Sequence, residues 1–594
     1  MHYSPNFKSS PYCVPSPDGQ FIATLTSATT ILIRSTRTLE TVESLKLPSG
    51  LAAAPVTTSS LSLLWSPSST TLLAATPDQL HAQSVGSAAA AGGPPALRAS
   101  VRNPASSGAG TRPPLAHIAF GARDEEVLVF AALGLKLLVY DLAASAAVEV
   151  VPSPKFFHQP GPAGAAAAVV SRAYSLRPAT GHLALLTRTA GRDTVSIHHP
   201  ETRALQRSWS PDTSDAHGLA WSPDGSWLLV WESPAHGRRL LLYTPDGQLF
   251  RALTRFGNSH DDVGSRGGDD GDDDAAAAAA LEPGIKLCRF SPDGSKCLIL
   301  DHSRSIAVLD TATWRTQLVL THPVTIEPQD TLQVWQEQLG ASSSFPSPTF
   351  VRATQPVSPL TTSTNTTAAG NASTSGESTR QAADHHHHHP SGPSSGCSSA
   401  TLDASSTLLV SRLDDSPGAL WIWDLAAAEL RAVLLFHARA VDWAWHPRSR
   451  ELLLIRCLDE AGAVTISTWD PLSAGPVYVP LAERLFTGAA GSGSSARRSR
   501  TGGNGGSSSG SSSGGGGVEW RNQALWLDAD GPPTMLLSDG KMYCLAAMGD
   551  GPPSGWQGAR GSCESMLLEG DSLQVDLPGD DTSMLEDTFS FKHS

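Results

Sequence analysis

Residues that could bind a metal occur in this chain inside low-complexity stretches. Residues 385–389 are five consecutive histidines, and imidazole nitrogens can coordinate zinc, copper or nickel. A homopolymeric run in a Ser/Thr-rich stretch, however, provides no fixed partners that would orient the rings. The aspartates between residues 269 and 274 lack the alternating ligand spacing and terminal glutamate of an EF-hand loop. We therefore predict no metal site.

Catalytic motifs are equally weak. The pattern GxSxG occurs at residues 506–510 and 510–514, but a nucleophile elbow must follow a buried strand and open a helix, whereas this tract is almost pure Gly and Ser. No phosphate-binding loop, dinucleotide fingerprint, kinase motif set or HExxH motif is present in the sequence. Arg497, Arg498 and Arg500 form a compact basic patch, which we interpret as a solubilising loop feature that an acidic partner could use. We expect neither an enzyme nor a cofactor.

Composition narrows the class further. A net charge of -14 over 594 residues argues against nucleic-acid binding, which needs clustered Lys and Arg. The start of the chain lacks a signal-peptide pattern, and no stretch of 18 uninterrupted apolar residues predicts membrane insertion, so we expect a cytosolic or nuclear chain. Seven widely spread cysteines without CxxC spacing predict reduced, core-filling thiols; they stand at positions 13, 288, 297, 397, 457, 544 and 563.

The elements that would position any site are best seen in residues 217–254. Short runs of Leu, Val, Trp and Tyr alternate there with Ser-Pro-Asp-Gly, with residues 232–237 and with Thr-Pro-Asp-Gly. Each run has strand length, and Pro, Asp and Gly suit the successive positions of a turn. Four strands in under forty residues match one blade of a β-propeller, which must pack against similar blades to bury its faces.

Similar units recur along the chain. Nine of them start near residues 11, 61, 115, 173, 217, 284, 407, 440 and 523. Two close their third strand on a Trp-Asp pair, Trp423-Asp424 and Trp469-Asp470, and Tyr140-Asp141 and Leu309-Asp310 are weaker versions. This is the WD dipeptide of WD40 repeats, in which the apolar residue packs between blades and the Asp begins the next turn. The Trp residues of the LLWSP, LAWSPDG and DWAWHP segments are expected to be structural in the same way.

We therefore predict an all-β, WD40-type β-propeller over residues 7–548. About nine four-stranded units form either one large ring or two unequal propellers. Segments without periodicity are expected to be disordered, because they could not bury enough apolar area to offset their ordering entropy. They are an Ala/Gly/Pro-rich insert at 87–113, an acidic and Ala-rich insert at 257–280, a Ser/Thr/His-rich insert at 342–399, a Gly/Ser insert at 488–517 and an acidic tail at 549–594.

Three blocks carry a more specific resemblance. Residues 210–250 hold an acidic DTSD lead-in, GLAWSPDG, LLVWE and LLLYTPDGQLF; residues 284–326 hold GIKLCRFSPDG and a Trp before strand four; and residues 419–447 hold ALWIWDL and the following strand. Together these resemble the family of WD repeat-containing protein eight, the WRAP-type WD-repeat proteins of the centrosome and spindle pole. The resemblance is weak in units two to four and in the last unit, and the inserts have no counterpart in it.

The resemblance implies a non-enzymatic adaptor at the microtubule-organising centre, which helps anchor microtubule minus ends and organise the spindle or cilium. It also implies a coiled-coil centrosomal anchoring protein as partner, together with a minus-end kinesin and microtubule-associated complex. An alternative is a propeller subunit of a translation-initiation or other large assembly. Among the loop residues of the fifth unit, Trp231, His236, Arg238 and Arg239 are the partner-binding candidates, because an exposed aromatic and Arg make good interface anchors.

Overall fold

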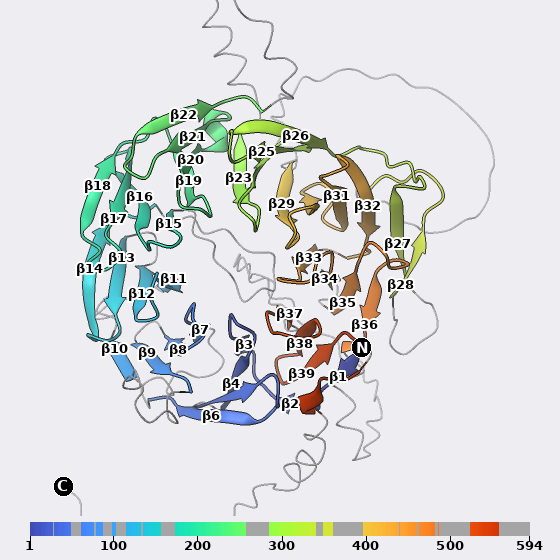
Figure 1. Cartoon of the computed structure of the whole chain (residues 1–594), viewed down its shortest axis with the longest axis horizontal. Coiled ribbons are helices and arrows are strands. Elements are labelled where there is room, and N and C mark those ends of the chain that lie inside the picture. Colours follow the sequence, from blue (N-terminus) through green and yellow to red (C-terminus); the bar gives the residue numbers. More distant parts are fainter. Residues whose placement is uncertain are drawn as a thin grey trace, which may run out of the picture.

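A computed structural model shows an all-β protein whose nine blades form one β-propeller ring (Figure 1). The structure describes residues 1–27, 29–48, 61–76, 79–86, 98–102, 115–131, 135–155, 173–256, 284–339, 348–359, 396–438, 440–459, 463–481, 485, 523–549 and 551–556. The predicted WD40-type propeller is confirmed, and of the two expected arrangements the single ring is the one observed. Within these residues no helix has the length and apolarity to cross a membrane.

Each blade is built on a twisted antiparallel sheet whose innermost strand lines the centre of the ring and whose outermost strand lies at the circumference (Figure 1). Blades 1 to 3 are β3 (Cys13–Pro15), β4 (Phe21–Ser27), β5 (Thr30–Ser35), β6 (Thr41–Lys46); β7 (Ser62–Trp65), β8 (Thr71–Ala75), β9 (Gln79–Ser84), β10 (Arg98–Arg102); and β11 (Leu115–Phe120), β12 (Glu126–Ala131), β13 (Lys136–Asp141), β14 (Ala146–Pro152).

The next three blades follow the same order. Blades 4 to 6 are β15 (Tyr174–Leu176), β16 (Leu183–Thr189), β17 (Arg192–His198), β18 (Leu205–Trp209); β19 (Ala216–Trp221), β20 (Leu228–Glu232), β21 (Leu240–Tyr243), β22 (Leu249–Leu253); and β23 (Ile285–Phe290), β24 (Lys296–Asp301), β25 (Ser305–Asp310), β26 (Arg315–Thr321). A short 3-10 turn, η4 (Pro234–His236), connects β20 to β21.

Blade 7 is wider than its neighbours, with six strands. Its four usual strands are β29 (Cys397–Leu402), β30 (Leu408–Leu413), β31 (Ala419–Asp424) and β32 (Glu429–Leu435). The connection from blade 6 contributes β27 (Gln333–Leu339), which pairs in parallel with the outer strand β32, and β28 (Pro348–Arg352), which extends the sheet further outward. The sheet edge of a blade can therefore accept a fifth and a sixth strand in this protein.

Blades 8 and 9 complete the ring. Blade 8 contains β33 (Ala440–Trp445), β34 (Leu453–Leu458), β35 (Val464–Trp469) and β36 (Val477–Val479), and blade 9 contains β37 (Gln523–Leu527), β38 (Thr534–Ser538) and β39 (Met542–Ala547). The outer edge of blade 9 comes from the other end of the chain, where β1 (His2–Tyr3) and β2 (Phe7–Lys8) both pair antiparallel with β39. The propeller thus begins at residue 2, five residues before the predicted start, and its two ends close the ring.

The turn sequence that repeats along the chain has one conformation at three places. The serines of the Ser-Pro-Asp-Gly segments, Ser16, Ser222 and Ser291, are buried, and each hydroxyl accepts a hydrogen bond of 2.9 Å from the backbone N–H five residues later. The glycines that end these segments have φ between 67° and 74°, a left-handed conformation that glycine adopts without strain. These turns join the first strand to the second and lie on one face of the ring, called here the turn face.

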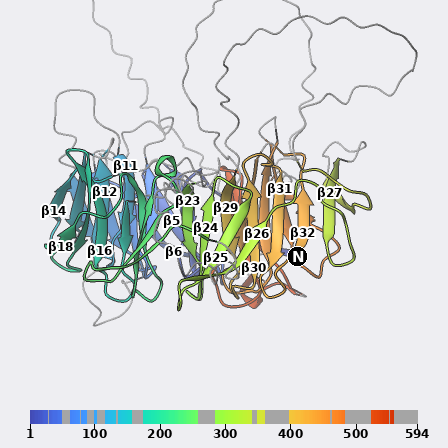
Figure 2. The same cartoon turned by 90° about the horizontal axis from the view of Figure 1, so that it is seen from above.

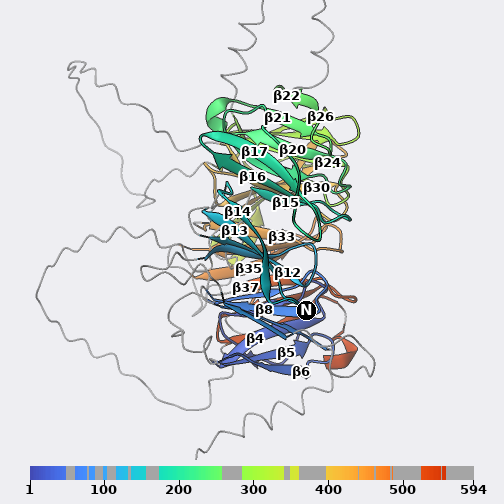
Figure 3. The ribbon, with the colours of Figure 1, turned by 90° about the vertical axis from the view of Figure 1, so that its left-hand side faces the viewer.

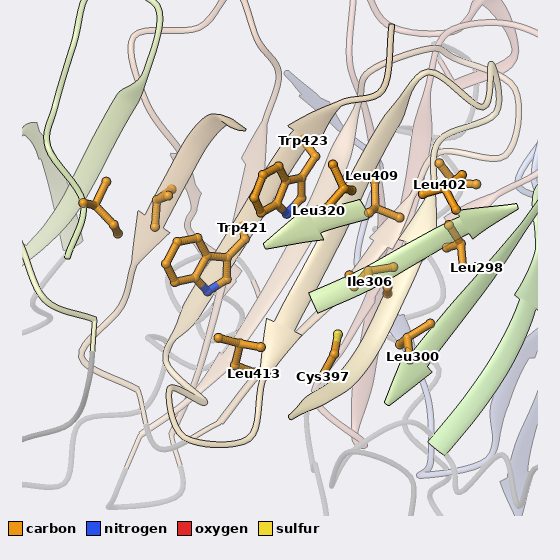
Figure 4. Packing of buried hydrophobic residues seen from close by; sticks show 14 of the residues in the cluster. Leu298, Leu300, Ile306, Leu320, Cys397, Leu402, Leu409, Leu413, Trp421 and Trp423 are labelled. Carbon is orange, nitrogen blue, oxygen red and sulfur yellow. The ribbon is translucent and has the colours of Figure 1, made fainter. Parts of the chain in front are cut away.

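The core lies between blades and not inside them. One cluster joins Leu298, Leu300 and Ile306 of blade 6 to Leu409, Trp421 and Trp423 of blade 7 (Figure 4). Trp423 is 5% exposed, and the Oδ1 atom of the following Asp424 accepts hydrogen bonds from the backbone N–H groups of Ala426 and Ala427 at 3.0 and 3.1 Å. The roles predicted for the WD dipeptide, packing between blades and starting a turn, are both confirmed here.

Two predicted inserts contain strands. The segment 87–113 includes β10, which pairs with β9 over five residues, and the segment 342–399 includes β28 and the beginning of β29. The tail 549–594 includes a short 3-10 turn, η7 (Ser554–Trp556), and Trp556 is buried and donates its Nε1–H to the carbonyl of Thr36 at 3.1 Å. The remaining expectations of disorder, including those for 257–280 and 488–517, lie outside the described residues.

Candidate protein-interaction surface

The loop from Glu232 to Arg239 joins β20 to β21 in blade 5 and holds the predicted partner-binding residues. In it Ala235 and His236 are exposed, on the 3-10 turn η4. The turn begins with Pro234, whose fixed φ suits a first helical position, and ends at Gly237 with φ of 91°. Of the four candidates, His236 is the one whose exposure agrees fully with the prediction.

The premise of an exposed Trp231 is wrong. This side chain is 2% exposed and belongs to the apolar cluster between blades 5 and 6. Its indole lies over Gly218 on the neighbouring strand β19, so close that a Cβ atom on Gly218 would be 2.3 Å from the ring. Trp231 thus fills the core at the end of the buried strand β20, as the preceding Leu and Val do, and is not available for docking a partner.

Arg238 and Arg239 are held by carboxylates. Arg238 pairs with Asp301 of blade 6, and Arg239 pairs with Asp212, which precedes the first strand of its own blade. The Arg238–Asp301 pair is largely buried, with side-chain exposures of 11% and 5%. Arg238 thus fastens two blades together, while Arg239 is partly open to solvent.

The acidic lead-in at residues 212–215 has a structural role of the same kind. The carboxylate of Glu232 accepts the backbone N–H groups of Ser214 and Asp215 at 2.9 and 2.6 Å. Asp215 in turn pairs with Lys155 at 2.7 Å and with Arg188. Burial acts to raise the pKa of Asp215, but the hydrogen bond and charge of Lys155, with those of Arg188, outweigh it and lower that pKa below its ordinary value.

Ion pairs of this type recur around one face of the ring. Besides those of blade 5, Lys286 pairs with Asp414 and Arg304 pairs with Asp415, in both cases between blades 6 and 7. The paired residues lie at three kinds of place in a blade: the end of the second strand, the turn after it, and the beginning of the first strand. All three are on the face of the ring opposite the turn face. We call this side the ion-pair face.

A polar network fixes the junction of blades 6 and 7. The Nε2 atom of buried His322 lies 2.8 Å from the hydroxyl of Ser411, which also accepts the Nε1–H of Trp423 at 3.2 Å. The other ring nitrogen of His322 lies 2.6 Å from the carbonyl oxygen of Arg304. Burial lowers the pKa of His322 to about 4, so this imidazole is neutral at physiological pH.

The turn face also has an ion pair, which is buried between blades 3 and 4. The guanidinium of Arg203 donates two hydrogen bonds of 2.5 Å to the two carboxylate oxygens of Glu126, and both side chains are 1% exposed. The pairing of two residues 77 positions apart could not be inferred from their types or spacing. A glutamate at the start of an apolar strand was the available signal, since an ion this deeply buried requires a partner.

The cysteines conform to the predicted structural role where they are described. The six described cysteines are buried and form no disulfide, and burial raises the pKa of Cys13 and of Cys397 to about 12, so these two thiols are protonated at neutral pH. Among the residues that the structure describes, no group of His, Cys, Asp or Glu side chains is arranged to hold a metal ion. The histidine run 385–389 and both GxSxG segments lie outside the described residues.

The outermost strands form the lateral surface of the ring, which the edge-on views display (Figures 2 and 3). The first four residues of β18 and of β22 are all exposed. Large apolar side chains stand among them: Leu205 is 59% exposed, Leu249 47% and Phe250 58%. Sequence reasoning missed this surface, because a Leu or Phe in an outer strand has the same sequence signature as one in the core.

Comparison with known proteins agrees with the fold. The chain is 27% identical over 305 residues to WD repeat-containing protein WRAP73 of Mus musculus, which covers 50% of this chain and 57% of that protein. It is 22% identical over 304 residues to an uncharacterized WD repeat-containing protein of Schizosaccharomyces pombe, with 48% and 49% covered. The chain therefore spans about half the length of the curated relatives it matches. No protein-family model matches it.

Solved structures show distant likeness. A eukaryotic initiation factor is 10% identical with a TM-score of 0.43, and it covers 80% of this chain and 88% of that one. The dihydro-heme d1 dehydrogenase NirN is 12% identical with a TM-score of 0.38, covering 80% and 75%. The Dos1 propeller is 11% identical with a TM-score of 0.30, covering 51% and 68%. At these scores the similarity carries no argument about initiation or dehydrogenation.

Proposed function

We propose that this chain, a WD-repeat β-propeller protein of the kind that serves as a protein-interaction scaffold, acts as an adaptor at the microtubule-organising centre. In this proposal it is located in the cytoplasm, at centrosomes, spindle poles and basal bodies. It helps anchor microtubule minus ends and organise spindle or cilium assembly, through binding and without catalysis. A coiled-coil anchoring protein and a minus-end kinesin are the partners that we expect.

The observation that carries the proposal is the similarity to WRAP73, together with the three family-like blocks. Those blocks fall in blades 5 to 8: the acidic lead-in and blade 5, blade 6, and the junction of blades 7 and 8. In the structure their distinctive residues build contacts between blades, as Asp215 does with Lys155 and as His322 does with Ser411. The resemblance thus includes residues that fix the ring geometry, which supports a shared rigid platform.

Imaging tests the location. The full chain carrying a small fluorescent tag is expressed at its natural level and followed through division beside a pericentriolar marker, with the tag alone as control. A focus at each spindle pole, retained after microtubules are depolymerised, is the expected result. A diffuse signal in both interphase and mitosis would refute the microtubule-organising-centre role and leave the fold untouched.

Purification separates the two candidate assemblies. Affinity capture of the tagged chain followed by mass spectrometry should recover a coiled-coil centrosomal protein with kinesin or tubulin. Recovery of ribosomal subunits and initiation factors in their place would favour the translation alternative. A parallel capture in high salt distinguishes stable partners from those attracted by the net charge of -14.

A further inference from the structure

We propose that the outer edge of blade 5, strand β22, binds an extended peptide of alternating apolar and acidic residues, which adds to the sheet as a fifth strand. The inference rests on the proposed scaffold function and names a surface and a partner chemistry for it. A strand at the edge of a sheet presents backbone N–H and C=O groups to an incoming strand, and many proteins use this mode of recognition.

Blade 5 ends at β22, since the order of its sheet is β19, β20, β21, β22. From Leu249 to Ala252 every residue of this strand is exposed, and only Leu253 is buried. Leu249 and Phe250 together make β22 the described outer strand with two large apolar side chains in solvent. An added strand would cover both, because successive side chains point to opposite faces of the sheet.

Phe250 packs against a neighbouring aromatic ring although it is 58% exposed. Its ring lies 4.6 Å from that of Trp227, and Trp227 lies 6.4 Å from Trp314 of blade 6, edge to face. Trp314 is itself 2% exposed and packed in the core between blades 5 and 6. An aromatic side chain that already packs against another ring loses little conformational entropy on binding, which is the property of an interface anchor.

The charge of this edge selects the partner. Strands β18 and β22 contain no Asp or Glu, whereas Arg207, Arg251 and Arg255 are exposed on them or directly after them. Arg207 belongs to blade 4 but lies close to the start of β22, because its charge, after the hydrogen bond of Thr244, helps lower the pKa of Asp246 in the turn before that strand. The Nη1 atom of Arg251 donates to the carbonyl of Trp314 at 3.3 Å, which holds its guanidinium at this edge of the ring. Acidic side chains on a bound strand would meet these cations, while basic ones would be repelled.

Blade 7 shows that a blade of this ring accommodates such an addition. There β27 pairs with the outer strand β32 through residues 333–336 and 432–435, and Ala432, Val433 and Leu434 are 1% exposed or less beneath it. In blade 5 the corresponding outer strand is left uncovered by any described residue of the sheet. The outer edge of blade 7 is thus covered by β27 of the same chain, whereas the outer edge of blade 5 is exposed, apolar and basic.

The test uses the full chain and a fluorescein-labelled eight-residue peptide of alternating valine and glutamate, with binding read as fluorescence anisotropy. Two control peptides have the same valines and glutamates in two blocks, or lysine in place of glutamate. Phe250→Asp should weaken binding about tenfold or more. The matched variant Val42→Asp, on the outer strand of blade 1 where Val42 is 46% exposed, should leave it unchanged.

Circular dichroism of both variants verifies the fold, and Arg207→Glu, which leaves the apolar side chains intact, provides a second measurement. It should weaken binding by about fivefold and reduce its dependence on salt. Equal binding of the block peptide or the lysine peptide, or unchanged binding by Phe250→Asp and Arg207→Glu, overturns the proposal. So does a peptide-independent dimer that Phe250→Asp dissociates in ultracentrifugation, because the edge would then pair with a second copy.

The outcome is separable from that of the proposed function. Peptide binding that fails while the tagged chain still marks spindle poles overturns this inference alone. Peptide binding that succeeds in a chain with diffuse localisation overturns the microtubule-organising-centre role alone.

Discussion

The buried pair of Glu126 and Arg203 gives the sharpest stability prediction. Replacing Glu126 by glutamine keeps the shape of the side chain but removes its charge, and Arg203 is then left ionised at 1% exposure. One of the two hydrogen bonds of 2.5 Å is also lost, because an amide has a single acceptor oxygen. Breaking a buried ion pair from one side costs about 3 to 5 kcal/mol, so Glu126→Gln should destabilise the propeller by that amount.

Removing both charges together should cost less than removing one. The double variant Glu126→Leu, Arg203→Met removes the side-chain partners of the N–H of Ala122, 3.0 Å from Glu126, and of the carbonyl of Gly181, 2.9 Å from Arg203. The carbonyl of His199 also loses a 3.4 Å hydrogen bond from Arg203 but keeps the one from the backbone N–H of residue 203. At about 1 kcal/mol each, the losses at Ala122 and Gly181 amount to about 2 kcal/mol before any gain from the added apolar surface. The two single changes are therefore expected to be strongly non-additive.

Urea unfolding followed by tryptophan fluorescence measures the parent, Glu126→Gln, the single variants Glu126→Leu and Arg203→Met, and their double variant, in 0.05 M and 0.5 M NaCl. Salt should alter the cost of Glu126→Gln little, because the pair is shielded from solvent ions. Arg448→Ala is the control, since Arg448 is 51% exposed and its pairing with Asp528 should matter little to the midpoint. A Glu126→Gln protein within about 1 kcal/mol of the parent, or a double variant as unstable as the sum of the singles, would refute the reasoning.

Three further outcomes follow from packing, titration and ring closure. Gly218→Ala should lower the melting temperature by several degrees, because a Cβ would lie 2.3 Å from the Trp231 indole; a Trp231→Leu background should recover most of the loss in the same thermal scan. Burial lowers the pKa of His322 to about 4 from its ordinary 6.5, so the unfolded chain binds a proton that the folded chain excludes between these values. Unfolding free energy should thus fall with decreasing pH, by about 1.4 kcal/mol at pH 5.5, and His322→Gln should reduce this slope in urea titrations at pH 7.5 and 5.5. Deleting residues 1–8 removes both closing strands, and limited proteolysis should then cleave within residues 523–549 faster than in the full chain.

Local patterns were sufficient to predict the blades. Alternating apolar runs and Ser-Pro-Asp-Gly turns depend on backbone conformation within a few residues, and the WD pairs depend on one turn; hence the nine units and their internal order agree with the structure. The strands that sequence reasoning missed are β1, β2, β10, β27 and β28, which lie outside the clear repeat patterns. They are stabilised by pairing with a neighbour, as β10 is with β9, and this information lies in the partner strand.

The candidate site was harder to predict, because exposure is decided between blades. Trp231 and Phe250 are both aromatic residues in strands of blade 5, yet one is 2% and the other 58% exposed. The difference in exposure arises because β20 lies within the sheet of blade 5, whereas β22 lies at its outer edge. The next blade, which covers Trp231, starts more than thirty residues after β22 in the chain. In the sequence Arg238 likewise has the features of a surface cation, whereas in the structure it pairs with Asp301 of the next blade.

The pairing of β1 and β2 with β39 has a consequence for synthesis of the protein. Ser4 and Leu545 hydrogen-bond across 541 positions, and at about 5 to 20 residues per second a ribosome needs about half a minute to two minutes to make the chain between them. During that time the first strands have emerged without their partner, and the apolar side chains of Phe7 and Ile22 that blade 9 will cover face solvent. Vectorial translation thus produces an open arc, which can become a ring only after the last blade leaves the exit tunnel. We expect nascent chains of this protein to be clients of ribosome-associated chaperones until that moment.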